Sequence, residues 1–170
     1  LLIFTIENYF PNIYNKNTMA STITPTTFHI KIKEEHIVKG LKTLNETFFT
    51  IKDITNVDRR IVTLPPTTSI DLININGIDP GAGTFPSSSM KYVRISNLDT
   101  SSSLAVSFTS SNDDNWSMKC LPESSLMFSS PDVTGSQFNG TFPDDIINIS
   151  LYSLSSSLDV EYVVVNSDNS

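Results

Sequence analysis

Short runs in which apolar and polar residues alternate recur from Met90 to Val165, and they restrict the chain to β-structure. An alternation of period two places one set of side chains on a buried sheet face and the other in water. Segments rich in serine, asparagine and proline separate the runs, and such segments are typical of turns. The pattern is clearest in four runs: 91–95, 104–108, 147–151 and 159–164.

The spacing of the runs predicts an all-β fold, an antiparallel, jelly-roll-like β-sandwich of about eight to ten short strands. Asn76-Gly77 favours a hairpin turn, and Gly40 marks a turn or a bulge. We expect loops over 79–89 and 129–145, and one helical turn near Pro143. The expected strands are 26–34, 37–41, 47–54, 61–64, 70–75, 90–97, 103–110, 116–121, 125–128, 146–153 and 158–165.

The length of 170 residues suits a single sandwich domain, which we place at residues 19–170. Residues 1–18 differ in character, because an apolar hexapeptide is followed by an Asn- and Tyr-rich stretch. Since Met19-Ala20-Ser21 resembles a translation start, residues 1–18 are either upstream coding or an extended arm whose apolar end adds to a neighbour as a strand.

The charge balance argues against nucleic acid as a partner. The chain has 18 acidic and 11 basic residues and a net charge of −7, whereas nucleic-acid binding depends on Lys and Arg that neutralise phosphates. The basic doublet Arg59-Arg60 is interpreted as a solvated strand end. No run approaches the roughly 20 apolar residues of a membrane span, so no membrane partner is expected either.

The sequence contains no recognisable catalytic motif, and we expect neither enzymatic activity nor a cofactor. Its two histidines, His29 and His36, both lie on expected polar faces, whereas nucleophilic catalysis needs an oriented base. The acidic doublets Asp113-Asp114 and Asp144-Asp145 lack the ligand spacing of a calcium loop and are interpreted as solvated turns.

Cys120 is the single cysteine, so an internal disulfide is excluded. It shares strand parity with Trp116 and Met118, which predicts a small buried side chain. We expect Trp116 to pack in the core rather than to stack on a sugar.

Several segments together resemble small β-sandwich virion structural proteins of marine bacteriophages and related environmental viruses. The resemblance extends over most of residues 20–166 and brings no catalytic or binding residues with it. It implies a structural component of a virus particle. The segments that carry it are Asp-Arg-Arg-Ile-Val-Thr-Leu-Pro at 58–65, Gly-Ala-Gly-Thr-Phe at 81–85, Lys-Tyr-Val-Arg-Ile-Ser-Asn-Leu-Asp at 91–99, Lys-Cys-Leu-Pro-Glu-Ser-Ser at 119–125 and the closing strand at 158–165.

We therefore expect a non-enzymatic capsid component located in the virion, a minor capsid, cement or decoration protein. Its expected partners are copies of itself, as a homo-trimer or homo-pentamer, and other capsid proteins. The alternatives are a secreted or cell-surface carbohydrate-binding module, for which four Asn-x-Ser/Thr tripeptides are a weak signal, and a small hydrolase. The residues expected at inter-subunit contacts are Leu1, Leu2, Ile3, Phe4, Ile6, Phe28, Ile30 and Ile32.

Overall fold

The computed structural model describes residues 26–75, 83–85, 90–111, 113–129, 146–153 and 156–167. All eleven elements found in these ranges are β-strands, which confirms the all-β prediction. The strands form sheets of two, five and four strands. In the described part of the chain, no helix is long and apolar enough to cross a membrane.

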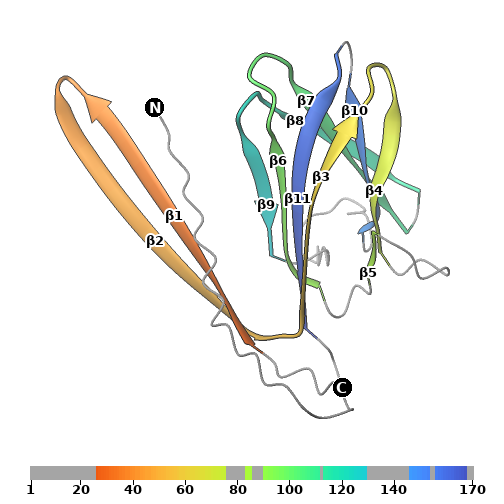
Figure 1. Cartoon of the computed structure of the whole chain (residues 1–170), viewed down its shortest axis with the longest axis horizontal. Coiled ribbons are helices and arrows are strands. Elements are labelled where there is room, and N and C mark those ends of the chain that lie inside the picture. Colours follow the sequence, from red (N-terminus) through yellow and green to blue (C-terminus); the bar gives the residue numbers. More distant parts are fainter. Residues whose placement is uncertain are drawn as a thin grey trace, which may run out of the picture. The chain divides into compact units, whose positions relative to one another are not determined.

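The chain divides into two compact units, residues 1–55 and residues 56–170. The first unit contains a two-stranded antiparallel hairpin, β1 (Thr26–Val38) and β2 (Leu41–Ile54). Its strands run side by side along their whole length (Figure 1). Because the hairpin forms a sheet of its own, the strands of the sandwich begin at β3, whereas the sequence prediction placed the first sandwich strand at residue 26.

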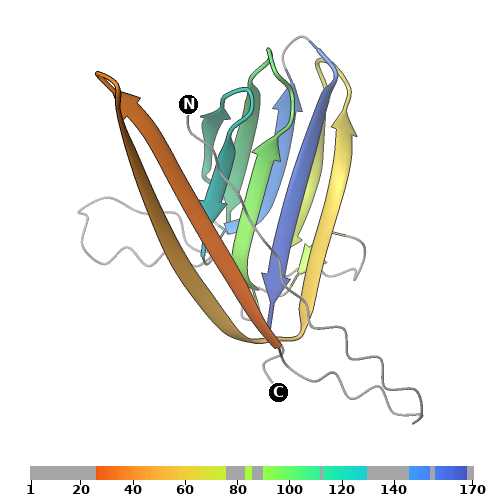
Figure 2. The same cartoon turned by 60° about the vertical axis from the view of Figure 1, so that its left-hand side comes forward.

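The second unit is a β-sandwich of two sheets, which Figures 1 and 2 show as two layers. Its four-stranded sheet has the order β3-β11-β6-β9, and its five-stranded sheet the order β5-β4-β10-β7-β8. The strands are β3 (Asn56–Leu64), β4 (Ser69–Ile75), β5 (Thr84–Phe85), β6 (Met90–Asn97), β7 (Leu104–Ser110), β8 (Asn115–Cys120), β9 (Ser125–Phe128), β10 (Ile146–Ser153) and β11 (Leu158–Asn166).

Early and late strands of the sandwich pair in reverse order. β3 pairs with β11, β4 with β10, β6 with β9 and β7 with β8, all antiparallel. Further antiparallel pairs, β11 with β6 and β10 with β7, join these ribbons into the two sheets. The first and last parts of the unit are thus interleaved in both sheets, so neither half can complete a sheet alone.

A single hydrophobic core fills the space between the two sheets. Fully buried side chains come from both layers, for example Ile95 and Val164 from one and Val106 and Ile149 from the other. An aromatic group links the layers near β8 and β9. The ring of Phe108 stacks on Trp116 at a centroid distance of 5.4 Å and meets Phe128 edge-on at 6.0 Å.

Three parts of the sequence prediction need correction. The expected strands 37–41 and 47–54 are not separate elements, because β1 continues to Val38 and β2 runs unbroken from Leu41. β3 begins five residues earlier than expected, at Asn56. The expected loop 79–89 contains the short strand β5, which pairs with β4 in parallel, so the sandwich is not wholly antiparallel.

Gly83, just before β5, is required by the close approach of two backbone segments. Its φ is +90°, and a Cβ placed there would lie 2.9 Å from the carbonyl oxygen of Leu72. The Asn74 amide donates a hydrogen bond of 2.7 Å to the Gly83 carbonyl. The other features expected between 76 and 82 and between 130 and 145, including the Asn76-Gly77 turn and the helical turn near Pro143, lie outside the described residues.

Candidate interaction surfaces

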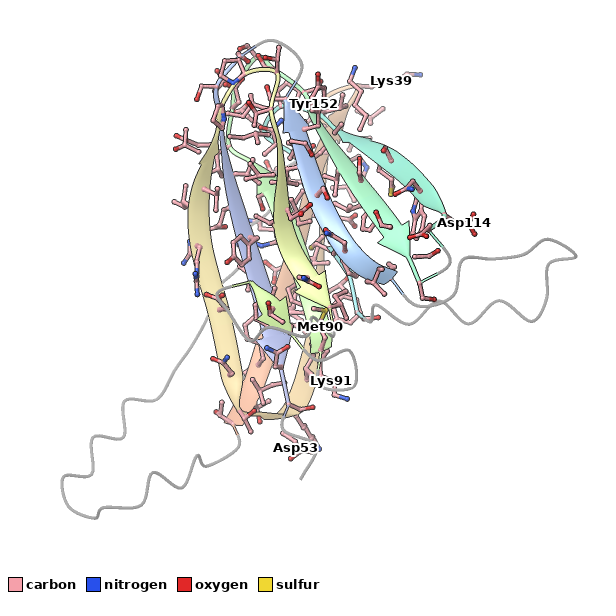
Figure 3. The ribbon with its side chains drawn as sticks, turned by 90° about the vertical axis from the view of Figure 1, so that its right-hand side faces the viewer. Lys39, Asp53, Met90, Lys91, Asp114 and Tyr152 are labelled. Carbon is pink, nitrogen blue, oxygen red and sulfur yellow. The ribbon has the colours of Figure 1, made fainter. Side chains whose placement is uncertain are left out.

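The β1–β2 hairpin closes in a two-residue turn whose neighbours are apolar. Lys39 and Gly40 both have positive φ, +50° and +80°, as a type I′ turn requires. This identifies Gly40 as a turn residue, one of the two roles expected for it. Val38 and Leu41 form the last pair before the turn, and Lys39 is labelled in Figure 3.

The end of the hairpin exposes apolar side chains on both of its faces. Val38 and Leu41 pair directly and share one face, whereas Ile37 and Leu44 lie on the other. Each of the four side chains is half or more exposed, and Leu41 is the most exposed at 75%. We call these four residues the apolar tip. An amphipathic ribbon lying on a single surface would need only one apolar face, so the tip is suited to contacts on two sides.

Polar cross-strand pairs hold the middle of the hairpin. The Lys31 ammonium lies 3.2 Å from Glu46 and 5.4 Å from the centre of the Phe48 ring. Lys42 pairs with Glu35 at 2.9 Å, and the hydrogen bond from this ammonium lowers the pKa of the Glu35 carboxyl. Such pairs contribute roughly 0.2–1 kcal/mol each, so they fix the register of the ribbon but supply no buried core.

The contact residues expected from sequence lie at the base of the hairpin or outside the described part. Phe28, Ile30 and Ile32 share one face of β1, as their alternation predicts. Phe28 and Ile30 are buried and Ile32 is half-buried, so the exposed aliphatic side chains of the described hairpin lie farther along, at the apolar tip. The other expected residues, Leu1, Leu2, Ile3, Phe4 and Ile6, are outside the described residues, and the inter-subunit role of all eight stays a prediction.

A buried asparagine fixes the loops at one end of the sandwich. The Nδ2 group of Asn97 donates hydrogen bonds to the carbonyl oxygens of Ser102, at 2.8 Å, and Leu121, at 3.2 Å, while its Oδ1 accepts one from the Asp99 amide. The Glu123 amide in turn donates to the Asp99 carbonyl at 3.0 Å. The β6–β7 and β8–β9 loops are therefore joined. Tyr152 marks this end in Figure 3, and Met90 marks the opposite end.

These two loops expose a small apolar surface with acidic neighbours. Leu98 and Leu121 are both largely exposed, and Asp99 and Glu123 lie beside them in sequence. The Ser101 and Ser102 amides donate hydrogen bonds to the Asp99 carboxylate, and these lower the pKa of Asp99, so it stays ionised. We call Leu98, Asp99, Leu121 and Glu123 the loop end.

Charged residues bridge three strands on the outer face of the four-stranded sheet. Glu161 of β11 is almost fully buried. Its Oε1 accepts hydrogen bonds from Nε of Arg59, at 2.6 Å, and from Nη2 of the same residue, at 2.5 Å, and its Oε2 accepts one from Nη2 of Arg94, at 2.5 Å. Arg60, on the opposite face of β3, pairs with Asp58 at 2.9 Å. The basic doublet is thus occupied by ion pairs within β3 and across to β11, rather than standing at a strand end.

Among the described residues, those considered for catalysis or metal binding do not assemble into a site, and the doublet Asp144-Asp145 lies outside the described part. His29 lies across the ribbon from Thr50, with its Nδ1 3.3 Å from the hydroxyl, and both are exposed. His36 lies on the opposite face of β1, beside Thr43 on β2. Over the described ranges, no three His, Cys, Asp or Glu side chains gather so as to hold a metal ion.

Cys120 and Trp116 lie where their strand parity predicted. Cys120 is buried and belongs to the core, and Trp116 packs against it. Met118, which shares their parity, is an exception because it is about half exposed on the edge strand β8. Comparison of the chain with protein-family models and with curated proteins finds no match in either set.

Proposed function

We propose that this chain is a non-enzymatic structural component of a virus capsid, a minor capsid, cement or decoration protein. It acts by associating with copies of itself and with other capsid proteins. The observation that carries the proposal is the apolar tip, a group of four exposed aliphatic side chains at the end of the β1–β2 hairpin. Exposed aliphatic side chains gathered at one end of an element are typical of interaction sites.

The strand order supports the same proposal at the level of the fold. Two sheets ordered β3-β11-β6-β9 and β4-β10-β7-β8, with early strands paired to late ones, are the arrangement that we assign to a jelly roll. Jelly rolls occur in viral capsid proteins, and also in lectins and cupins. The fold is therefore compatible with a capsid role but does not by itself select it.

The position of the aromatic side chains favours the structural role over the glycan-binding alternative. A sugar-stacking platform needs exposed aromatic rings on one surface. Trp116 is instead stacked on Phe108. The exposed rings of Phe48 and Phe49 are adjacent in β2 and therefore point to opposite faces of the ribbon.

Mass spectrometry of purified particles from the source virus tests the proposal. We expect this chain at a fixed ratio to the major capsid protein, and we expect that ratio to survive repeated density-gradient purification. Its presence in the infected-cell lysate but not in the particles would contradict the capsid assignment.

A further inference from the structure

An exposed ribbon end with four large aliphatic side chains needs a surface that covers it. Among the described residues, β1 and β2 pair only with each other, and isolated two-stranded ribbons are marginally stable in water. Thirteen residues in β1 make the ribbon about 40 Å long.

Charge distinguishes the possible partners of the tip. Residues 26–54, the hairpin, carry five lysines and four carboxylates, whereas residues 56–170 carry five basic and thirteen acidic residues. Lys39 lies in the turn between Val38 and Leu41 of the tip, and the neighbouring Lys42 is paired with Glu35. An acidic sandwich attracts such a tip, whereas the net charge of −7 on the whole chain works against approach to an anionic membrane.

The loop end of the sandwich has the matching chemistry. It presents Leu98 and Leu121, two exposed aliphatic side chains, together with the ionised carboxylate of Asp99 and the exposed side chain of Glu123. The hydrogen bonds of Asn97 hold both loops in place before any partner arrives. A preorganised surface loses less conformational freedom on binding.

The sandwich edge formed by β3 is a poorer partner for the ribbon. Asp58 and Arg60 lie on the core-facing side of this edge strand and pair with each other. Inward-pointing charges on an edge strand discourage the addition of a further strand.

We propose that the apolar tip of the β1–β2 hairpin docks on the loop end of the sandwich in a second copy of this chain. The inference rests on the proposed function, because it specifies the contact through which copies associate. Two different surfaces meet in this contact, so it is heterologous. Successive contacts of this type close into a ring or continue as a filament.

Removal of one tip side chain tests the contact. Leu41→Ser in the full chain should raise the dissociation constant of the oligomer by about tenfold or more, measured by sedimentation velocity over a concentration series. The matched control is Ile61→Ser, because Ile61 is similarly exposed at 63% but lies on the outer face of β3. It should leave the dissociation constant unchanged. Circular dichroism should show the same thermal transition of the sandwich in both variants.

A charge exchange identifies the surface that the tip meets. Lys39 and Glu123 are both exposed and both have positive φ, so each tolerates the other's side chain equally well. Lys39→Glu alone and Glu123→Lys alone should each weaken association. The double variant Lys39→Glu/Glu123→Lys should restore it, because each tip then meets an oppositely charged loop end on the next copy in a ring of any size.

Each alternative occupant gives a different result. A tip docked within its own chain predicts a monomeric wild type. A lipid partner predicts that Leu41→Ser loses co-sedimentation with phosphatidylcholine or phosphatidylserine vesicles. Either result overturns the inference, as does a wild-type oligomer that Leu41→Ser leaves intact. The capsid role is tested separately, by mass spectrometry of purified particles. A negative result for the tip contact therefore does not contradict the capsid role.

Discussion

Val38 lies directly opposite Leu41 at the closing pair of the hairpin, and both side chains are more than half exposed. Neither residue is needed by the turn, since Lys39 and Gly40 supply the positive φ angles. Polar residues at this pair would keep the ribbon soluble and its register unchanged. In the proposed contact between copies, this aliphatic pair would be covered by the partner, in addition to the small stabilisation that a cross-strand pair gives the hairpin.

The charge cluster around Glu161 predicts unequal effects of removing its members. Glu161→Gln leaves Arg94, whose side chain is only 15% exposed, without its charged partner, and should lower the free energy of unfolding by about 3 kcal/mol. Arg59 is 60% exposed, so Arg59→Ala should cost about 1 kcal/mol or less. Urea denaturation of the two variants measures the difference. Equal losses of unfolding free energy in the two variants, or no loss in Glu161→Gln, would show that water already solvates the charge cluster.

Asn97 should stabilise the loop end through its side-chain amide. Asn97→Ala leaves the buried carbonyl oxygens of its partners without that donor and should destabilise the sandwich by about 2–3 kcal/mol. The matched control is Asn115→Ala, since Asn115 is exposed on the edge strand β8. Thermal unfolding should show a clear drop for the first variant and little change for the second. Equal melting temperatures for the two variants would contradict the stabilising role of the Asn97 amide.

Gly83 should not tolerate a side chain. Gly83→Ala combines a positive φ with a Cβ only 2.9 Å from a backbone oxygen, so we expect a loss of about 1–3 kcal/mol. Gly40→Ala is the useful comparison, because Gly40 also has positive φ but no atom within 4 Å of the added Cβ. Denaturant unfolding should rank Gly83→Ala as the more damaging change, and the reverse order would contradict the close approach.

The raised pKa of the Tyr162 phenol predicts that the protein loses stability at high pH. Burial first, and then the nearby Asp58 carboxylate, raise the pKa of this phenol above its usual value of 10.0, and burial also raises the pKa of Tyr92. The native state therefore retains both protons at a pH where the unfolded chain releases them. The stabilisation is fully present below about pH 10 and declines as the pH rises through the native pKa values.

Urea unfolding between about pH 9 and pH 11 measures this dependence. The double variant Tyr92→Phe/Tyr162→Phe should lose stability less steeply with pH than the wild type. Identical slopes would show that neither phenol titrates differently in the folded protein.

The strands of the sandwich core follow closely from local alternation. The expected bounds of β6, β9 and β10 agree with the structure, because each run alternates cleanly and ends at turn residues. β3 was predicted too short because Asp58 and Arg60 occupy core-facing positions and break the apolar pattern at an edge strand. β5 has no local signal, since its two residues are fixed only by their parallel pairing with β4.

The hairpin shows what alternation does not reveal. The polar run Glu34-Glu35-His36 was interpreted as the end of a strand, but a ribbon outside the core can be polar on both faces and still pair. The tip residues were seen as apolar, yet sequence does not distinguish exposed aliphatic side chains from buried ones. The loop end consists of the β6–β7 and β8–β9 loops, which are separate in sequence and which Asn97 joins. Their proximity follows from the order of the strands in the sheets, which local alternation does not reveal.

The most direct test of the account is the molar mass of the wild-type chain in solution. Multi-angle light scattering after size exclusion should give a multiple of 18.8 kDa, such as the expected trimer or pentamer, that falls on dilution. A mass of one chain at every concentration would contradict the claim that this protein acts by associating with copies of itself.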